Sequence, residues 1–487
     1  MTDPHAPSAD LAYLSVSEIE DRLAAGTLTS VALVSALLER IAAIDVADST
    51  VALRAIAALA PDALSLAAER DAERAAGHLR GPLHGIPVVI KDNVEAIGLP
   101  GTAGSTSLVG RPSREAPLVT RLREAGAILL ASTNLSQWAN IRSVRSTSGW
   151  SATGGLVGNP WALDRSAGGS SSGSGAAVAA GLAPLAVGTE TDGSIVCPAS
   201  VCGVVGLKPT VGVVPATYVV PISASQDSPG PLGRTVDDVA RMFGVLSASE
   251  APPDRSLRFA VATTWRTDHP ATDALVDALV AALRAAGHDV IDREVAVPGE
   301  EEGSDELAVL LGELHDDLSD YLARRPGEGV TSLAEVVEWE NAHAETELAH
   351  FGHDLFDAAL ATGGRAGDAY EAARRRNLAW AIDTCLQPAL EGVDVLLAPA
   401  YGPAWKSDLA VGGHPGPASV ATMPAAIAGW PIMNVPIGLV HGLPVGLAIL
   451  GRAHDEWTVL AAGRVVESLV DARGALGRPT WEVPTRG

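Results

Sequence analysis

Two glycine- and serine-rich loops, separated by a short apolar run, constrain this chain more than any other stretch. The first loop reads Gly-Gly-Ser-Ser-Ser-Gly-Ser-Gly from Gly168, and the second reads Gly-Thr-Glu-Thr-Asp-Gly-Ser-Ile-Val-Cys-Pro from Gly188. Clustered glycine is entropically costly, so it usually serves a positive φ, a close backbone approach or a row of N–H groups that face a ligand. Each loop also carries serines, which favours a hydroxyl nucleophile beside backbone donors.

Helix-like and strand-like segments alternate along the rest of the chain. Ser15 and Glu18 form a capping box at the start of a helix, and the run between the two loops should supply about one more helix. Further helices are expected over residues 61–80, 116–126, 235–246, 270–287, 304–324, 332–350, 352–362, 368–389 and 455–470. Strands are expected over residues 88–90, 127–131, 201–207, 257–262, 393–399, 433–438 and 445–450. This alternation favours an α/β layered fold, and 487 residues, 47% of them hydrophobic, can bury a large core.

Composition argues against several classes of protein. The formal net charge is −24, and no Lys/Arg cluster of the kind that forms a basic face appears, which argues against nucleic-acid binding and is typical of a solvated surface. The first residues lack the basic and apolar regions of a signal peptide, and no uninterrupted apolar run reaches about 18 residues. We therefore expect a cytoplasmic protein with no membrane contact.

The cysteines and histidines do not form a ligand pattern. The chain holds three cysteines, Cys197, Cys202 and Cys385, without a Cys-x-x-Cys motif, so neither a disulfide framework nor a zinc ribbon is expected. His343, His350 and His353 share one helical stretch, but their spacing does not give the close pair that zinc requires. No metal is predicted.

Lysine is rare in this chain, which makes its positions informative. Only Lys91, Lys208 and Lys406 occur, and arginine supplies the other basic residues. Unlike arginine, a buried lysine can lose its proton. Lys91 ends an apolar strand, where α/β folds often place active-site groups, although a lysine there could also extend to solvent.

Several known loop chemistries fail on the details. A phosphate-binding loop needs a lysine that this stretch lacks, and Val178 stands where a dinucleotide fingerprint needs Gly or Ala. The Gly-x-Ser-x-Gly pattern of a nucleophile elbow would select Ser171, but residues 163–167 do not read as the strand that should precede it. Class A β-lactamase chemistry fails because no lysine follows a serine by three residues.

The pattern that remains combines the two loops with the lysine-bearing strand. Together, the two loops and the segment Gly85-Ile86-Pro87-Val88-Val89-Ile90-Lys91-Asp92 resemble the amidase signature family of serine hydrolases. The second loop and Thr133-Asn134-Leu135-Ser136-Gln137-Trp138-Ala139-Asn140 resemble its peptide-amidase branch. The resemblance spans nearly the whole chain and implies one large α/β/α layered domain, with a central mixed, twisted sheet covered by helices.

The resemblance also implies roles for individual residues. Ser194 matches the nucleophile that forms the acyl-enzyme, Ser170 the bridging serine whose peptide bond to Gly169 is cis, and Lys91 the general base. Ser194 follows Ser170 by 24 residues, the spacing expected when the bridging serine is the first after Gly-Gly. The oxyanion hole would use the backbone N–H groups of Thr191, Asp192, Gly193 and Ser194. The substrate-binding residues would include Gln137, Trp138 and Ser171.

A lysine can act as the base only if its surroundings favour the neutral form. Near its ordinary pKa of about 10.4 it is protonated at neutral pH. Burial and hydrogen bonding would have to lower the pKa of Lys91 by roughly three units, about 4 kcal/mol against the cation. Neutral Lys91 would then take a proton from Ser170 while Ser170 takes one from Ser194.

Two residues depart from the common family pattern. Asp192 stands where glycine is usual, and aspartate tolerates a left-handed turn better than most residues. Val196 stands where arginine is usual, which removes any salt bridge that the arginine would make under the loop. Cys197 has apolar and proline neighbours and is expected to be a packed core thiol.

The sequence thus predicts a cofactor-free amide hydrolase built from four regions. These are an N-terminal helical region (residues 1–80), the signature core (81–250), a variable, helix-rich substrate-side region (251–395) and C-terminal strands with a helix (396–487). The predicted substrate is a small or peptide-like amide, with anilides, esters and carbamates as further options. Two alternatives stay open, the amidase subunit of a tRNA-dependent amidotransferase and a non-catalytic binding protein on the same scaffold.

Overall fold

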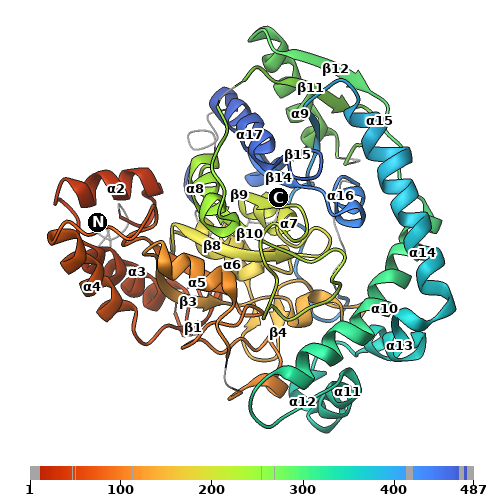
Figure 1. Ribbon diagram of the computed structural model, residues 1–487, viewed down its shortest axis with the longest axis horizontal. Coiled ribbons are helices and arrows are strands. Elements are labelled where there is room, and N and C mark those ends of the chain that lie inside the picture. The colour runs from red at the N-terminus through yellow and green to blue at the C-terminus, as the bar shows by residue number, and fades with distance from the viewer. Residues whose placement is uncertain are drawn as a thin grey trace.

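An 11-stranded mixed sheet organises the part of the chain that the computed structural model describes (Figure 1). The described residues are 11–46, 48–49, 51–111, 113–253, 255–267, 269–412, 420–470 and 476–479. The first five residues, considered above for a signal peptide, lie outside them. The strands are, in spatial order, β1 (Ile56–Leu59), β3 (Ile128–Thr133), β2 (Pro87–Lys91), β8 (Leu185–Glu190), β10 (Ser228–Gly233), β9 (Val205–Lys208), β14 (Ile432–Val440), β15 (Leu443–Leu450), β13 (Val395–Pro399), β11 (Arg258–Ala262) and β12 (Asp289–Arg293).

Parallel and antiparallel pairs both occur in this sheet, as the resemblance implies. The parallel pairs are β2 with β3, β2 with β8, β11 with β12 and β11 with β13. The C-terminal strands β14 and β15 join two parts of the sheet. β14 pairs with β9, the last strand of the first part, and β15 pairs with β13, the first strand of the second part. The α/β layered fold with a mixed central sheet is therefore confirmed.

Helices cover both faces of the sheet. They are α2 (Val16–Ala24), α3 (Ser30–Ile44), α4 (Ala63–Ala75), α5 (Pro117–Glu124), α6 (Ser172–Ala179), α7 (Val196–Cys202), α8 (Val236–Ser247), α9 (Pro270–Ala285), α10 (Glu300–Arg324), α11 (Leu333–Ala342), α12 (Ala344–Glu347), α13 (Asp354–Thr362), α14 (Asp368–Leu378), α15 (Gln387–Leu390), α16 (Thr422–Ala428) and α17 (Glu456–Val470), with a π-helical stretch at Ala379–Leu386. In Figure 1, α2, α3 and α4 form a lobe at one side, and α10, α13 and α14 form an arc at the other. Of the helices built from described residues, none combines the length and the apolar character that crossing a bilayer requires.

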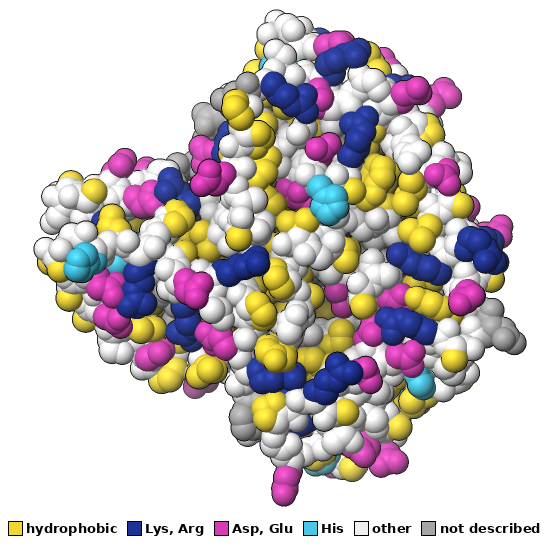
Figure 2. Space-filling view, viewed as in Figure 1, with side chains coloured by type: hydrophobic (Ala, Val, Ile, Leu, Met, Phe, Trp, Pro, Cys, Tyr) yellow, Lys and Arg dark blue, Asp and Glu magenta, His cyan; other side chains and the backbone are white. Residues whose placement is uncertain are grey.

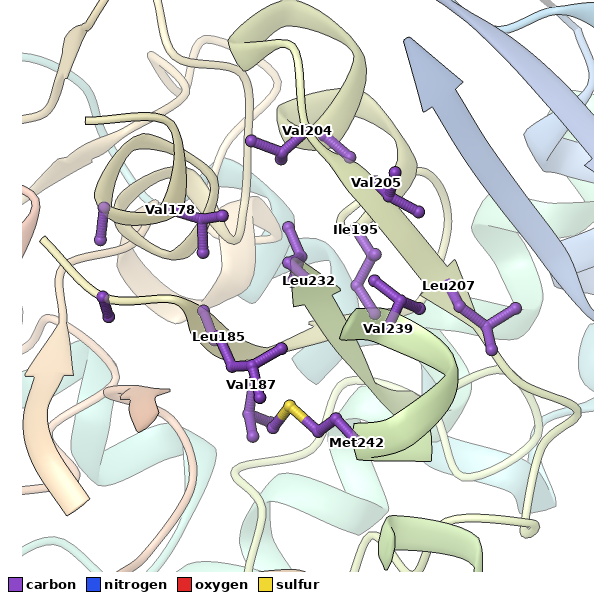
Figure 3. Packing of buried hydrophobic residues seen from close by; sticks show 14 of the residues in the cluster. Val178, Leu185, Val187, Ile195, Val204, Val205, Leu207, Leu232, Val239 and Met242 are labelled. Atoms are coloured by element: carbon purple, nitrogen blue, oxygen red, sulfur yellow. The ribbon is translucent and has the colours of Figure 1, made fainter. Parts of the chain in front are cut away.

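The core beneath the two glycine- and serine-rich loops is tightly packed (Figure 3). A Cβ on Gly230 of β10 would lie 3.0 Å from the Cδ1 atom of Ile195, and a Cβ on Gly233 would lie 3.2 Å from Cγ2 of Val239. Because residues 230 and 233 point to opposite faces of a strand, the loop that leads into α7 covers one face and α8 the other. Glycine at these positions lets both layers approach the sheet closely.

Several boundaries differ from the sequence-based expectation. Residues 201–207 were expected as a strand, but Val201 and Cys202 end α7 and β9 begins only at Val205. Residues 163–167 were expected as loop, but most of them form β7 (Ala162–Ser166), which pairs with β6 (Gly158–Asn159) in a separate two-stranded ribbon. The run between the two loops holds β8 as well as α6, and β10 and β12 were not expected.

Other expectations hold more closely. The capping box at Ser15 is formed, with the Glu18 carboxylate accepting from the Ser15 backbone N–H at 2.7 Å. The expected helix over residues 332–350 splits into α11 and α12, because His343 has non-helical dihedral angles. The N-terminal region also contains the strand β1, although helices dominate it. The boundaries of the four regions stay a prediction.

Acidic and basic side chains are interspersed on the face that Figure 2 shows, without a contiguous basic area. Exposed arginines are commonly paired with carboxylates, as Arg258 is with Asp289 at 2.7 Å. This surface fits the interpretation that most of the acidic side chains behind the net negative charge face solvent. A set of buried carboxylates, described below, departs from it.

Candidate active site

Three chain segments meet at one edge of the sheet. The strands β2 and β8 run parallel, so Lys91 and Glu190 leave the sheet at the same edge. The first glycine- and serine-rich loop leads into α6 there, and the second begins within the last residues of β8 and continues beyond Glu190. The fold thus brings together two parts of the chain that lie 79 residues apart, Lys91 and Ser170.

Lys91 and Ser170 are in direct contact and fully buried. The Nζ atom of Lys91 lies 2.8 Å from Oγ of Ser170, and both residues have no exposed surface. Nζ also donates to the hydroxyl of Thr189 at 2.9 Å and to its carbonyl oxygen at 3.2 Å. The peptide bond between Gly169 and Ser170 is cis, as the resemblance implies. Ser194 lies in the adjoining loop and retains 8% exposure.

Burial changes the acid–base chemistry of Lys91. Loss of hydration disfavours the cation and lowers the pKa of Lys91 to about 7, against the opposing attraction of Asp227 and Glu190. A large fraction of Lys91 is therefore neutral near pH 7. In that form its nitrogen has a lone pair and can accept a proton from the adjacent Ser170 hydroxyl.

The nucleophile loop, as we call the loop that carries the predicted nucleophile Ser194, is folded around the Glu190 carboxylate. Its Oε2 atom accepts the backbone N–H groups of Ile195 at 2.7 Å and Val196 at 2.8 Å, and the carboxylate also accepts from Gly193. Gly193 has a φ of 75°, and a Cβ there would lie 2.5 Å from the hydroxyl oxygen of Tyr401. Glycine is therefore required at position 193 both by the backbone and by its neighbour.

Asp192 is compatible with the loop because it does not carry the left-handed turn. The positive φ belongs to Gly193, and Asp192 is not among the non-glycine residues with positive φ. Its carboxyl makes a hydrogen bond to Thr422, and burial raises the pKa of Asp192 to about 6. Within the described part of the chain, its Oδ1 atom has no hydrogen-bond partner.

Val196 is buried in an apolar cluster that includes Ala425 and Ile432. No arginine stands at position 196 to face Glu190, and a positive charge comes from Lys208 at the end of β9. Burial raises the pKa of Glu190, and the attraction of Lys208 counters that rise. Lys208 is fully buried and donates to the carbonyl oxygens of Trp430 at 2.9 Å and Pro209 at 3.1 Å. Burial lowers the pKa of Lys208 to about 8.

The three predicted substrate-binding side chains all have partners within the protein. Ser171 donates to the carbonyl oxygen of Thr189 at 3.0 Å and accepts its N–H at 3.1 Å. Trp138 donates its indole N–H to Glu340 at 3.1 Å, and Gln137 donates its amide to Glu347. Their role in substrate binding stays a prediction.

The nucleophile elbow does not form, although a strand does precede it. The strand β7 belongs to the separate ribbon rather than the main sheet, and both hydrogen bonds of the Ser171 hydroxyl go to Thr189. Cys197 is 5% exposed, and burial raises the pKa of its thiol to about 12, as expected for a packed core residue.

Sequence reasoning missed several residues of the site, and Thr189 and Asp227 are the two nearest to the proposed chemistry. Thr189 lies within the second loop, but nothing in its letters distinguishes it from Thr191. Asp227 directly precedes β10, a strand that was not expected because it is rich in proline and glycine. The pairing of β10 with β8 brings Asp227 to the site. A polar residue directly before an unrecognised central strand was the available signal.

Comparisons with known proteins give a consistent result. A family model described as Amidase matches residues 32–460. The crystal structure of native peptide amidase from Stenotrophomonas maltophilia has a TM-score of 0.87, 39% identity, and covers 96% of this chain and 98% of that chain. A structure of peptide amidase with the competitive inhibitor chymostatin gives a TM-score of 0.88 and 40% identity, with 96% and 99% covered. A glutamyl-tRNA(Gln) amidotransferase subunit of Symbiobacterium thermophilum is 33% identical over 480 residues, 92% of this chain and 95% of that protein.

Proposed function

Because this chain belongs to the amidase signature family, we propose that it hydrolyses small or peptide-like amides with Ser194 as nucleophile, Ser170 as proton relay and Lys91 as base. The observation that carries this proposal is the 2.8 Å contact between Nζ of Lys91 and Oγ of Ser170 in a fully buried site. A buried amine with a pKa of about 7 is suited to accept a proton near neutral pH.

The proposed reaction begins with two coupled proton transfers. Lys91 takes the proton of Ser170 while Ser170 takes that of Ser194, and the Ser194 oxygen attacks the carbonyl carbon of the substrate. The negative charge that develops on the carbonyl oxygen is stabilised by the backbone N–H groups of Thr191, Asp192 and Ser194, whereas the predicted fourth donor, the N–H of Gly193, is held by Glu190. The carbon–nitrogen bond then breaks, the relay returns a proton to the leaving amine, and an ester of Ser194 is left.

Water completes the cycle. It loses a proton through Ser170 to Lys91 and attacks the ester, which releases the carboxylic acid and returns the proton to Ser194. Because only the acyl group stays on the enzyme, an amide, an anilide and an ester of the same acid form the same intermediate, whereas a carbamate leaves a carbamoyl or alkoxycarbonyl group on Ser194. We propose peptide-like primary amides as the main substrates, since the solved structures at 39–40% identity are of peptide amidases.

A second candidate function is the amidase subunit of a tRNA-dependent amidotransferase, which the 33% identity to a glutamyl-tRNA(Gln) amidotransferase subunit supports. The two candidates differ in what they need for turnover. A peptide-amide hydrolase works as the purified chain alone, whereas an amidotransferase subunit works within a complex.

The proposal is tested by release of ammonia or amine from a panel of C-terminal peptide amides, simple primary amides, anilides, esters and aryl carbamates. The wild-type chain should hydrolyse peptide amides without added proteins, and Ser194→Ala and Lys91→Ala should not. Lys406→Ala is the matched control, because that lysine is exposed and should be dispensable. Full turnover by either site variant would overturn the relay, and activity only with partner subunits would favour the second candidate.

A further inference from the structure

One carboxylate links the nucleophile loop to a neighbouring loop. The Oδ1 atom of Asp227 accepts the hydroxyl of Thr191 at 2.6 Å. Its Oδ2 atom accepts the backbone N–H groups of Ile222 at 2.8 Å and Ser223 at 3.0 Å. Thr191 precedes Ser194 by three residues, so Asp227 contacts the loop that carries the proposed oxyanion-binding amides.

The segment 222–227 is itself held by one face of α10. Three acids of that helix, which we call the carboxylate row, are Glu306, Glu313 and Asp317. They accept hydrogen bonds from the amide of Gln226 at 3.0 Å, the hydroxyl of Ser223 at 2.6 Å, the backbone N–H of Ser225 at 3.0 Å and the backbone N–H of Ala224 at 2.9 Å. Spacings of seven and four residues place the three acids on one side of the helix. The row thus fixes four consecutive residues next to Asp227.

Asp227 also belongs to the electrostatic environment of Lys91. The two acids that attract the Lys91 cation are Asp227 and Glu190, and Glu190 is itself attracted by Lys208. Asp317 of the carboxylate row repels the charge of Asp227. The row is partly neutralised by Arg365, which lies 2.7 Å from Asp317 and 3.6 Å from Glu313.

We propose that Asp227 is a positioning residue for the hydrolysis, which ties the nucleophile loop to α10 through Thr191 and keeps Lys91 basic enough to accept the Ser170 proton. This inference rests on the proposed function of Lys91. Burial favours neutral Lys91, whereas the negative charge of Asp227 favours the cation. Asp227 therefore limits how far burial weakens the base, and it couples the helix-rich region after residue 250 to the chemistry.

The test compares Asp227→Asn with Thr191→Val in the full chain, by kcat and KM for a peptide amide between pH 5 and pH 10. Asparagine keeps the size and can still accept the backbone N–H groups of residues 222 and 223, but it removes the charge. We expect the acid limb of its pH profile to move about one unit towards lower pH, with kcat at pH 9 reduced about three- to tenfold. Thr191→Val keeps the Asp227 carboxyl but removes a hydroxyl that lowers its pKa, so kcat should fall and the acid limb should move less than in Asp227→Asn. Asp320→Asn, an exposed acid-to-amide change on α10, is the matched control.

The outcomes separate this inference from the proposed function. If Ser194→Ala and Lys91→Ala are inactive and the Asp227→Asn profile coincides with wild type, only the role of Asp227 is overturned. An acid limb that moves to higher pH would overturn it as well. If Lys91→Ala retains turnover, the proposed function itself fails. Should Asp227→Asn not fold, Asp227→Glu keeps the charge and alters the contact with Thr191. Its acid limb should then stay in place while kcat falls, and a wild-type kcat would overturn the positioning role.

Discussion

Replacing Lys91 by methionine should abolish turnover and yet stabilise the folded protein at and below neutral pH. Burial lowers the pKa of Lys91 from 10.5 to about 7. That difference corresponds to roughly 5 kcal/mol at 1.36 kcal/mol per pH unit, which the native state loses by holding this amine away from water. Methionine fills a similar volume without a charge, so Lys91→Met removes that cost.

The sign of the pH dependence follows from proton counting. Between about pH 7 and pH 10.5 the unfolded chain keeps the Lys91 proton and the folded chain has released it. The contribution of Lys91 to stability therefore becomes more favourable as the pH rises through this window, by about 1.4 kcal/mol per unit. The full cost is present below pH 7, so the advantage of Lys91→Met is largest there and shrinks by roughly 2–3 kcal/mol between pH 7 and pH 9.

Part of this advantage is offset because the Ser170 hydroxyl loses its partner, at about 1–3 kcal/mol, whereas the Thr189 hydroxyl still accepts the Asn93 amide at 3.0 Å. The assay is urea unfolding of wild type and Lys91→Met at pH 6, 7, 8 and 9. Groups common to both proteins, including Lys208, cancel in the difference. A difference in unfolding free energy that does not change between pH 7 and pH 9 would refute the reasoning, because it would mean that Lys91 stays charged in the fold.

Three further predictions concern the same site. The kcat/KM of the wild-type enzyme should fall below a pH near 7, because protonation of Lys91 removes the base, and a profile flat down to pH 5 would contradict this assignment. Gly193→Ala should reduce kcat at least about tenfold, since its Cβ would lie 2.5 Å from the Tyr401 hydroxyl oxygen at a φ of 75°; Gly212→Ala, also at positive φ but with no atom within 4 Å, should leave kcat near wild type. Cys197 should not react with a thiol reagent at pH 8 in the native protein, because burial raises its pKa to about 12, and rapid labelling there by mass spectrometry would contradict the packing.

The sequence alone singled out the three residues of the proposed relay, but not the residues that hold them in place. Lys91, Ser170 and Ser194 lie in short strings whose order and spacing are distinctive, and the fold brings Lys91 and Ser170 into contact. Thr189 and Asp227 touch the site through pairing of β8 with β2 and β10, which no local pattern reports. Which strands lie side by side depends on the whole sheet, so the contribution of these two residues could be seen only in the structure.

The strand β10 shows why one element of that sheet was missed. It reads Ser-Pro-Gly-Pro-Leu-Gly, a composition typical of turns. The strand nevertheless lies between β8 and β9 in the middle of the sheet. It pairs with β8 along its whole length but with β9 only at Leu232 and Gly233, so neither proline takes part in the pairing with β9. Proline is tolerated where no ladder hydrogen bond depends on its nitrogen.

The net negative charge was interpreted from composition as a solvated surface, and α10 shows where this interpretation fails. Glu306 and Glu313 are buried, at 5% and 1% exposure, and their carboxylates hold the segment 222–227. A buried carboxylate is costly unless hydrogen-bonded, so its position is set by the backbone and side-chain donors that face it. Acids on one face of α10 therefore determine where Asp227 lies, and through Thr191 they influence the nucleophile loop. Substitutions in this helix can change the chemistry without touching the substrate, and the hydrogen-bond donors of residues 223–226 limit which acids of the row can be replaced.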